Sequence, residues 1–493
     1  MTKLNRRSFL QHTLAVSSVA LASVARAQAP DAGANPQPAR SPNPGSSGAL
    51  PRVGVAIVGL HGRGMEHLNA YATNDGADVV ALCDVDESTF AKAQGRLKDH
   101  DRPEAKTYTD LRRLLEDPRV AAVSIATPNH WHALASIWAM QAGKDVYVEK
   151  PVCHNVSEGR RMEQTRVKYA RVCQAGTQAR SSPAHREAMQ YVHDGHIGKV
   201  VLARGLCYKR RKSIGHFDDA PVPDGVDYDL WLGPAPKRPF NPNRFHYNWH
   251  WNWDYGNGDL GNQGVHQMDI ARWAINATLP RAVACVGGRF GYEDDGQTPN
   301  SELALFDFGQ GAPPLMFEVR GLETPPLRGV TIGDIIYGTD GFVAFGEEDS
   351  RAAAAFDNDG KEVRAFTGDS HDHFGNFLAA VRGRSQSELN CPVLEGHLSA
   401  ALCHLANISY RLGAPAPFET PRKPFGDNLD AAEAFGRFEQ HLADNALKLR
   451  EMTYRHGPRL EFDAKSERFV SNATADAMLA REYRRPFVVP EQV

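Results

Sequence analysis

The sequence predicts an α/β protein whose first folded domain is a doubly wound parallel sheet. Strand-like apolar runs at residues 53–58, 79–86, 121–126 and 145–149 alternate with helix-like segments. Strands and helices that alternate in this way form parallel sheets covered by helices. A glycine-rich turn also separates the first strand from its helix, which is typical of nucleotide-binding domains. One helix-like segment begins at Met65, and two others span residues 108–115 and 136–143.

The chain is too long for a single hydrophobic core, so its length predicts two or three domains. It has 493 residues, of which 42% are hydrophobic and 23% are charged, as in ordinary globular proteins. The formal net charge is -3, and the one basic run is short, at residues 209–212. This distribution argues against a nucleic-acid partner. The seven scattered cysteines form no C-x-x-C pair, which favours isolated buried thiols over a metal site.

The first 27 residues resemble a twin-arginine export signal. Arg6 and Arg7 precede an apolar stretch at residues 13–25, and Ala-Arg-Ala at residues 25–27 fits a cleavage site. The apolar stretch is too short to anchor the chain in a bilayer. We therefore expect an exported, periplasmic protein that uses the twin-arginine export machinery and has no membrane anchor. The alternative is a chance arginine pair on a cytoplasmic tail.

The rest of the chain is expected to hold two domains between a linker and an extension. Residues 28–50 are rich in Pro, Ala, Ser and Gly, which predicts a flexible linker. The dinucleotide-binding domain is predicted at residues 51–177. A substrate-binding and oligomerisation domain follows at residues 178–420. Residues 421–493 are predicted to be an extension that packs against a neighbouring copy or covers the second domain.

The glycine turn after the first strand predicts a site for a dinucleotide. Backbone N–H groups and the helix dipole at such a turn hold a pyrophosphate. The usual G-x-G-x-x-G spacing has a glycine where this chain has His61. We therefore expect the imidazole to point away and Gly62 to share the role of the missing glycine. The predicted cofactor-binding residues here are Gly59, His61, Gly62, Arg63 and Gly64.

An acidic residue at the end of the second strand indicates which dinucleotide binds. Asp84 lies 20 residues beyond Gly64, the spacing expected of a carboxylate that binds the adenosine ribose. A carboxylate at this position repels a 2′-phosphate, so NAD is the predicted cofactor and NADP is less favoured. The alternative is that Asp84 is a helix cap or turn residue.

Polar side chains also follow the next two strands. In parallel sheets, ligands bind beyond the carboxyl ends of the strands. A lysine is almost never fully buried without a partner, so Lys150 is either paired, for example with Glu149, or faces a site. His132 is equally compatible with a structural role. The predicted cofactor-binding residues at these strand ends are Thr127, Pro128, Asn129, His132, Glu149 and Lys150.

Three segments together resemble the Gfo/Idh/MocA oxidoreductases, which include inositol and sugar dehydrogenases and glucose-fructose oxidoreductase. They are the glycine turn with Asp84, the sequence Glu-Lys-Pro at residues 149–151, and GDLGNQGVHQMDIARW at residues 258–273. The last segment matches the family pattern L-x-D-x-G-x-H-x-x-D, except that Asn262 stands where the family has an aspartate. The resemblance implies a Rossmann domain followed by an α/β domain with a large, mostly antiparallel sheet. Strand-like runs at residues 199–208, 282–290, 301–308, 315–322 and 330–337 fit this fold.

The resemblance also implies a catalytic role for Lys150 and His266. Oxidation of a secondary alcohol needs a base for the hydroxyl proton, and histidine is suited to this. Lys150 would stabilise the developing alkoxide. A helix at residues 264–274 places Asp269 on the same face as His266, so Asp269 is expected to orient the imidazole. Asn262 cannot relay a proton but can bind a sugar hydroxyl. The alternatives are that His266 is a helix histidine with its hydrogen bonds made inside the protein, and that Lys150 is paired with an acidic residue in a structural role.

Aromatic residues are concentrated at residues 240–258, directly before this helix. Their faces suit sugar rings, so Trp253 and Tyr255 are predicted substrate contacts. The alternative is an interface in a homo-oligomer, which we also expect to form. Metal binding by His246 and His250 would require this segment to be helical. His373, in a predicted helix at residues 370–384, is a further substrate candidate.

The predicted function is oxidation of a secondary hydroxyl of a sugar, cyclitol or glycoside by hydride transfer to NAD. An exported enzyme has no free NAD pool to exchange with, so a resident cofactor is expected. One alternative is a redox-neutral NAD-using glycosidase or epimerase. A second is a catalytically silent, exported sugar-binding protein that kept the pocket.

Overall fold

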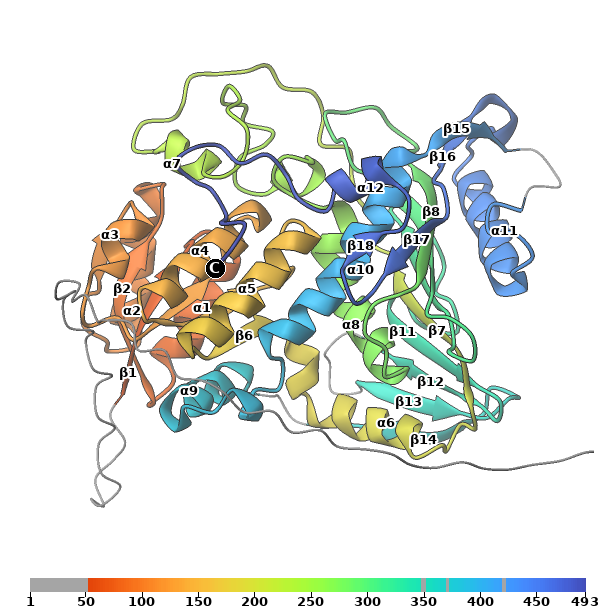
Figure 1. The fold of residues 1–493 in the computed structure, drawn as a ribbon, viewed down its shortest axis with the longest axis horizontal. Helices are drawn as coiled ribbons and strands as arrows, with labels where there is room; N and C mark the ends of the chain where they lie inside the picture. Colours follow the sequence, from red (N-terminus) through yellow and green to blue (C-terminus); the bar gives the residue numbers. More distant parts are fainter. Residues whose placement is uncertain (1–51, 347–351, 369–371, 419–422) are drawn as a thin grey trace, which may run out of the picture. The chain divides into compact units, whose positions relative to one another are not determined.

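The computed structural model describes residues 52–346, 352–368, 372–418 and 423–493. These residues form two β-sheets with helices packed against them (Figure 1). The predicted export signal and linker lie outside the described residues. None of the helices in the described ranges is long and apolar enough to cross a membrane.

The first sheet has six parallel strands in the order β3-β2-β1-β4-β5-β6. The strand order reverses between β1 and β4, which places a ligand crevice at the carboxyl ends of these two strands. The strands are β1 (Val53–Val58), β2 (Ala77–Cys83), β3 (Lys106–Tyr108), β4 (Ala122–Ile125), β5 (Asp145–Glu149) and β6 (Cys173–Gly176).

Helices cover both faces of this sheet, which explains why its central strands are apolar on both sides. Val55 and Ile57 of β1 pack against α1, α2 and α9, whereas Ala56 and Val58 belong to the core beneath α4 and α5. The helices are α1 (Arg63–Ala72), α2 (Ser88–Asp99), α3 (Leu111–Leu115), α4 (Asn129–Gln141), α5 (Val156–Tyr169) and α9 (His373–Gly383).

One predicted helix of this domain was too long. Residues 106–108 form the edge strand β3, and only Leu111–Leu115 is helical. Asp110 causes the break, because its extended backbone and its side chain, which accepts the N–H of Arg112, make it the N-cap of α3.

The second sheet has twelve strands in the order β14-β13-β12-β11-β7-β10-β9-β8-β16-β15, with β17 and β18 attached beside β8. All its pairs are antiparallel except β7 with β10, so the predicted fold class is confirmed. The strands are β7 (Val200–Cys207), β8 (Ala282–Gly288), β9 (Ser301–Asp307), β10 (Leu315–Arg320), β11 (Ile332–Gly338), β12 (Phe342–Phe345), β13 (Ala353–Phe356), β14 (Glu362–Phe366), β15 (Ala414–Pro417), β16 (Thr453–His456), β17 (Leu460–Asp463) and β18 (Arg468–Phe469).

The two faces of this sheet are covered by different parts of the chain. On one face lie α6, α8 and α10, and on the other lies α11 from the C-terminal extension. Phe435 and Phe438 of α11 are buried, and Arg437 pairs with the buried Glu318 of β10. The extension therefore covers its own domain. The helices are α6 (Pro183–His193), α7 (Tyr228–Leu232), α8 (Val265–Ala274), α10 (Val393–Leu412), α11 (Leu429–Asp444) and α12 (Ala473–Ala477).

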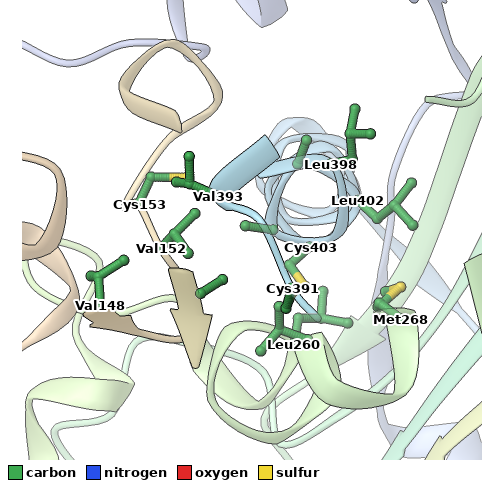
Figure 2. Close-up of a cluster of buried hydrophobic side chains, with 14 of the residues drawn as sticks. Val148, Val152, Cys153, Leu260, Met268, Cys391, Val393, Leu398, Leu402 and Cys403 are labelled. Atoms are coloured by element: carbon green, nitrogen blue, oxygen red, sulfur yellow. The ribbon is translucent and has the colours of Figure 1, made fainter. Parts of the chain in front are cut away.

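A continuous core joins the two sheets next to the predicted site. Figure 2 shows α10 between Val148, Val152 and Cys153 on one side and Leu260 and Met268 on the other. The first three residues flank the Glu149–Lys150 strand end, and the last two belong to the segment that carries Asn262 and His266. Because close-packed cores resist displacement, this packing fixes the two halves of the site relative to each other.

Candidate active site

The turn after β1 is shaped for close contact with a ligand. Gly59 has a φ of 84° and Gly62 a φ of 58°, conformations that side chains rarely adopt. A Cβ at Gly64 would lie 1.7 Å from the carbonyl oxygen of Gly59. The helix α1 begins directly afterwards, and no side chain caps its N-terminus. Its first N–H groups are therefore free to bind an anionic ligand.

The histidine in the glycine turn packs against the second domain and is one of the residues that line the cavity described below. The ring of His61 stacks on the ring of His246, with centroids 4.4 Å apart. His246 has a φ of 64°, and its Nε2 lies 3.2 Å from a carboxylate oxygen of Asp86. A contact between residues 61 and 246 therefore links the glycine turn to the aromatic stretch of the second domain.

Asp84 is held in place by two backbone N–H groups. One carboxylate oxygen accepts the N–H of Leu60 at 2.6 Å, and the other accepts the N–H of Asp86 at 3.0 Å. Burial raises the pKa of Asp84, and these two hydrogen bonds oppose the shift. The residue lines the cavity described next, so it serves as a turn residue and also faces the predicted ribose position.

A cavity of about 340 Å³ runs from Asp84 to Lys150 and Asn262. It is closed on one side by residues 222–251, which we call the cover segment. Seven residues of this segment line the cavity: Leu230, Trp231, Phe245, His246, Tyr247, Trp249 and His250. The aromatic stretch thus forms a wall of the dinucleotide cavity. The sequence predicted two other roles for it, sugar contact and an oligomer interface, and neither included this one.

The cover segment is attached to the first domain by its backbone. Asp86 and Val226 form a β-bridge, and the N–H of Asp227 donates to the carbonyl of Val85 at 2.9 Å. Phe240 and Phe245 are buried in an aromatic cluster with Trp231. Because burial of a phenylalanine contributes about 1.5–3 kcal/mol, lifting this segment carries a substantial cost.

The residues after β4 form the middle of the cavity. The ring nitrogens of His132 lie 2.7 Å from the carbonyl oxygens of Thr127 and Pro151. His132 thereby ties the ends of β4 and β5 together while lining the cavity. Asn129 is buried and donates to the side chain of Asn257 at 3.0 Å. The hydroxyl of Thr127 is buried and has no hydrogen-bond partner among the described residues, which leaves it free for a ligand.

Glu149 and Lys150 have different roles although they are adjacent. The carboxylate of Glu149 is buried and accepts hydrogen bonds from Arg63 at 2.8 Å and Gln178 at 3.2 Å, and it lies 3.0 Å from a ring nitrogen of His67. The carboxylate of Glu149 is therefore already engaged by side chains of the protein. Lys150 instead points across to the second domain, where its Nζ donates to the carbonyl of Asn262 at 2.9 Å.

The π-helical turn η3 (Leu260–Gly264) leads into α8. Asn262 of this turn lines the cavity, whereas His266 does not line it but lies close enough to Lys150 for the lysine charge to affect its pKa. Desolvation and the charge of Lys150 lower the pKa of His266 to about 3. The imidazole is therefore neutral at pH 7 and can accept a proton.

The structure does not support the predicted orientation of His266 by Asp269. The carboxylate of Asp269 accepts hydrogen bonds from Arg180 at 2.6 Å and from the hydroxyl of Ser399 at 2.6 Å. These partners hold the pKa of Asp269 below its usual value against the effect of burial. Asp269 therefore braces α8 against its neighbours.

Three predicted substrate contacts also lie away from the cavity lining. Tyr255 is fully buried in the aromatic cluster of the cover segment, and Trp253 packs against Arg411. The ring nitrogens of His373 lie 2.5 Å from the hydroxyl of Ser181 and 2.9 Å from the carbonyl of Ala175. These positions fit structural roles, whereas Asn262 does line the cavity.

The residues of the cavity fit a dinucleotide. The uncapped N-terminus of α1 suits the pyrophosphate and Asp84 suits the ribose hydroxyls. Thr127 and Lys150 also line the cavity. The residues that sequence reasoning missed at the adenosine end are Val85, Thr109, Asp110 and Leu111. They carry no motif and come together only through the fold.

Two segments of the chain match models of one family of proteins. Residues 53–177 match the oxidoreductase family GFO_IDH_MocA, NAD-binding Rossmann fold, and residues 201–284 match its C-terminal alpha/beta domain. The chain is therefore similar to the Gfo/Idh/MocA oxidoreductases over these two segments. Its first domain is accordingly an NAD-binding Rossmann domain, and the family consists of oxidoreductases.

Among curated relatives, the chain is 26% identical over 289 residues to a levoglucosan dehydrogenase from Pseudarthrobacter phenanthrenivorans, covering 54% of this chain and 66% of that protein. It is 31% identical over 157 residues to a glycosyl hydrolase family 109 protein from Saccharopolyspora erythraea, covering 31% and 34%. The chain thus spans between about a third and two thirds of the length of these relatives.

Among solved structures, levoglucosan dehydrogenase in complex with NADH superimposes with a TM-score of 0.54. The match covers 72% of this chain and 97% of that chain at 20% sequence identity. At this level of identity the likeness establishes the shared fold.

Proposed function

We propose that this protein oxidises a secondary hydroxyl of a sugar, cyclitol or glycoside by hydride transfer to NAD, which it keeps as a resident cofactor. The observation that carries the proposal is that Lys150 and Asn262 line one end of the dinucleotide cavity while the charge of Lys150 acts on the nearby His266. The nicotinamide, when bound, accepts the hydride from the carbon that bears the hydroxyl.

The side chains at this end supply the remaining steps. Lys150 donates a hydrogen bond to the hydroxyl oxygen and stabilises its negative charge as the proton leaves. His266 is neutral at pH 7 because desolvation holds its pKa at about 3. It accepts the proton as the adjacent alkoxide forms, since the growing negative charge raises its proton affinity. Asn262 positions another hydroxyl through its side-chain amide.

The cover segment supports the resident cofactor. A nucleotide in the cavity lies beneath Trp231, Phe245 and Trp249, so its exchange requires the loss of buried aromatic contacts. Retention of this kind suits a protein that works where free NAD is absent. We include export to the periplasm in the proposal, because residues 1–27 resemble a twin-arginine signal.

The proposal is tested by adding sugars, cyclitols and glycosides to the purified mature protein without added nucleotide. The expected result is a single turnover in which bound NAD is reduced, seen as the absorbance of reduced nicotinamide. A protein that binds sugars but never changes this absorbance, with or without added NAD, would refute hydride transfer and favour a silent binding protein.

A redox-neutral glycosidase or epimerase is the second candidate. Two observations favour it: the covered cavity and the likeness to a glycosyl hydrolase family 109 protein over 157 residues. In this reaction a sugar carbon is oxidised and the neighbouring C–H loses a proton. In a glycosidase the leaving group then departs and water adds across the resulting double bond, whereas in an epimerase the proton returns to the opposite face. In both cases the hydride would finally be returned to the oxidised carbon. Incorporation of deuterium from heavy water at the neighbouring carbon, with no net nucleotide reduction, would identify it.

A further inference from the structure

The reactive end of the cavity has an excess of positive charge. Each carboxylate close to it is already paired within the protein. The three pairs are Glu149 with Arg63, Asp259 with Arg211, and Asp269 with Arg180. In contrast, Lys150 and Lys209 form no salt bridge with a carboxylate in the described part of the chain, and both are half-buried.

The two lysines come from different domains and meet at one turn. Lys150 Nζ donates to the carbonyl of Asn262 at 2.9 Å, and Lys209 Nζ donates to the side chain of the next residue, Gln263, at 3.4 Å. Lys209 lies two residues beyond the end of β7. Both ammonium groups therefore lie beside η3, the turn that leads to His266.

The carboxylate of Glu149 attracts the charge of Lys150, but burial outweighs this attraction. Desolvation lowers the pKa of His250 and of His266 to about 3, so both rings are neutral at pH 7. Burial is the main cause that lowers the pKa of Lys150, and the charge of Lys209 contributes to the same shift. A desolvated cation without a counter-ion is costly, so an anion bound at this turn would relieve the repulsion.

The cofactor does not provide that anion. The predicted pyrophosphate position is the N-terminus of α1, beside Gly62 and Arg63. Lys209 is not part of the dinucleotide cavity lining. Its neighbour Arg210 is already paired with Glu323 at 3.1 Å. The ammonium group of Lys209, which has no carboxylate partner among the described residues, therefore lies beside the same turn as Lys150 and outside the dinucleotide lining.

We propose that the substrate carries an anionic group, a carboxylate or a phosphate, which Lys209 binds while Lys150 and His266 act on a hydroxyl of the same molecule. The inference rests on the proposed hydroxyl oxidation and narrows its substrate class to sugar acids or sugar phosphates. Lys209 is then a specificity-determining residue, because a neutral sugar leaves it with only the long contact to Gln263.

The first experiment uses the purified full-length holoprotein with matched substrates: glucose, glucuronate and glucose 6-phosphate. The variants are Lys209→Gln, Lys209→Arg and, as a control in the same basic run, the exposed Lys212→Gln. We expect the wild type to prefer an anionic sugar, and Lys209→Gln to raise its KM by about 10- to 100-fold, the range for loss of a charge-assisted hydrogen bond. Lys209→Arg should restore much of the loss, and Lys212→Gln should match the wild type. The carboxylate and phosphate arms show which anion is bound.

A binding measurement separates this proposal from the proposed function. Glucuronate and glucose are titrated into the holoprotein by calorimetry, with no turnover required. Tighter binding of glucuronate that disappears in Lys209→Gln supports the anion site even if no sugar is oxidised. Equal binding of both sugars by the wild type, or unchanged glucuronate binding in Lys209→Gln, overturns it. Turnover of neutral sugars alone would also overturn it while leaving hydroxyl oxidation intact.

Discussion

Replacement of Lys150 by methionine removes the ammonium group and keeps most of the side-chain volume. In the structure this group donates to the carbonyl of Asn262 at 2.9 Å and lies at the cavity end that receives the hydroxyl. Loss of one donor to a developing oxyanion costs about 2.7–4 kcal/mol of transition-state stabilisation. We therefore expect the rate of nucleotide reduction to fall by about 10²–10³-fold.

The assay is single-turnover reduction of the bound nucleotide by a substrate found in the sugar screen. Lys144→Met is the matched control, because Lys144 donates to the carbonyls of Asp117 and Val120 outside the cavity lining. Nucleotide content should be similar in both variants. A Lys150→Met protein that holds its nucleotide and reacts within a few-fold of the wild type would refute the assigned role of Lys150.

Three further predictions concern the cofactor and stability. Asp84→Ser should weaken NAD binding and improve NADP binding, because it removes a carboxylate from the predicted ribose position. Titration of nucleotide-free protein with both nucleotides measures this, and an unchanged preference for NAD would contradict the assigned role of Asp84. Phe245→Ala should speed nucleotide loss during gel filtration, whereas Phe366→Ala, which removes a buried ring away from the cavity lining, should not. Glu467 binds Arg160 and lies beside His397; although burial opposes it, these contacts lower the pKa of Glu467 to about 2. This folded-state pKa lies below the unfolded value of about 4.3. The ionised Glu467 therefore contributes its full stabilisation above about pH 4.3 and loses it as the pH falls towards 2. The difference in unfolding free energy between the wild type and Glu467→Gln should shrink over that range.

The first domain could be predicted from the sequence because its signals are local. The glycine turn, the acidic end of β2 and the lysine at the end of β5 each follow from a short segment and the rule that ligands bind at strand ends. Even in this domain, one predicted helix was longer than the observed α3, which begins after its N-cap Asp110. A single capping side chain can decide where a helix begins.

The rest of the site depends on contacts between distant residues. Helical spacing placed Asp269 on the same face as His266, but Arg180, 89 residues earlier, binds its carboxylate. The aromatic composition of residues 240–258 was evident, yet which of its rings face the cavity depends on the backbone pairing of Val226 and Asp227 with the end of β2. Periodicity within one segment carries no information about such partners.

The central claim is that the cover segment encloses a resident NAD beside Lys150 and His266. The most direct measurement is the mass and absorbance spectrum of the nucleotide released when the purified mature protein is denatured. We expect NAD or NADH at close to one molecule per chain, retained through purification without added nucleotide. Protein that is empty after purification, and that binds and releases added NAD within seconds, would contradict the claim.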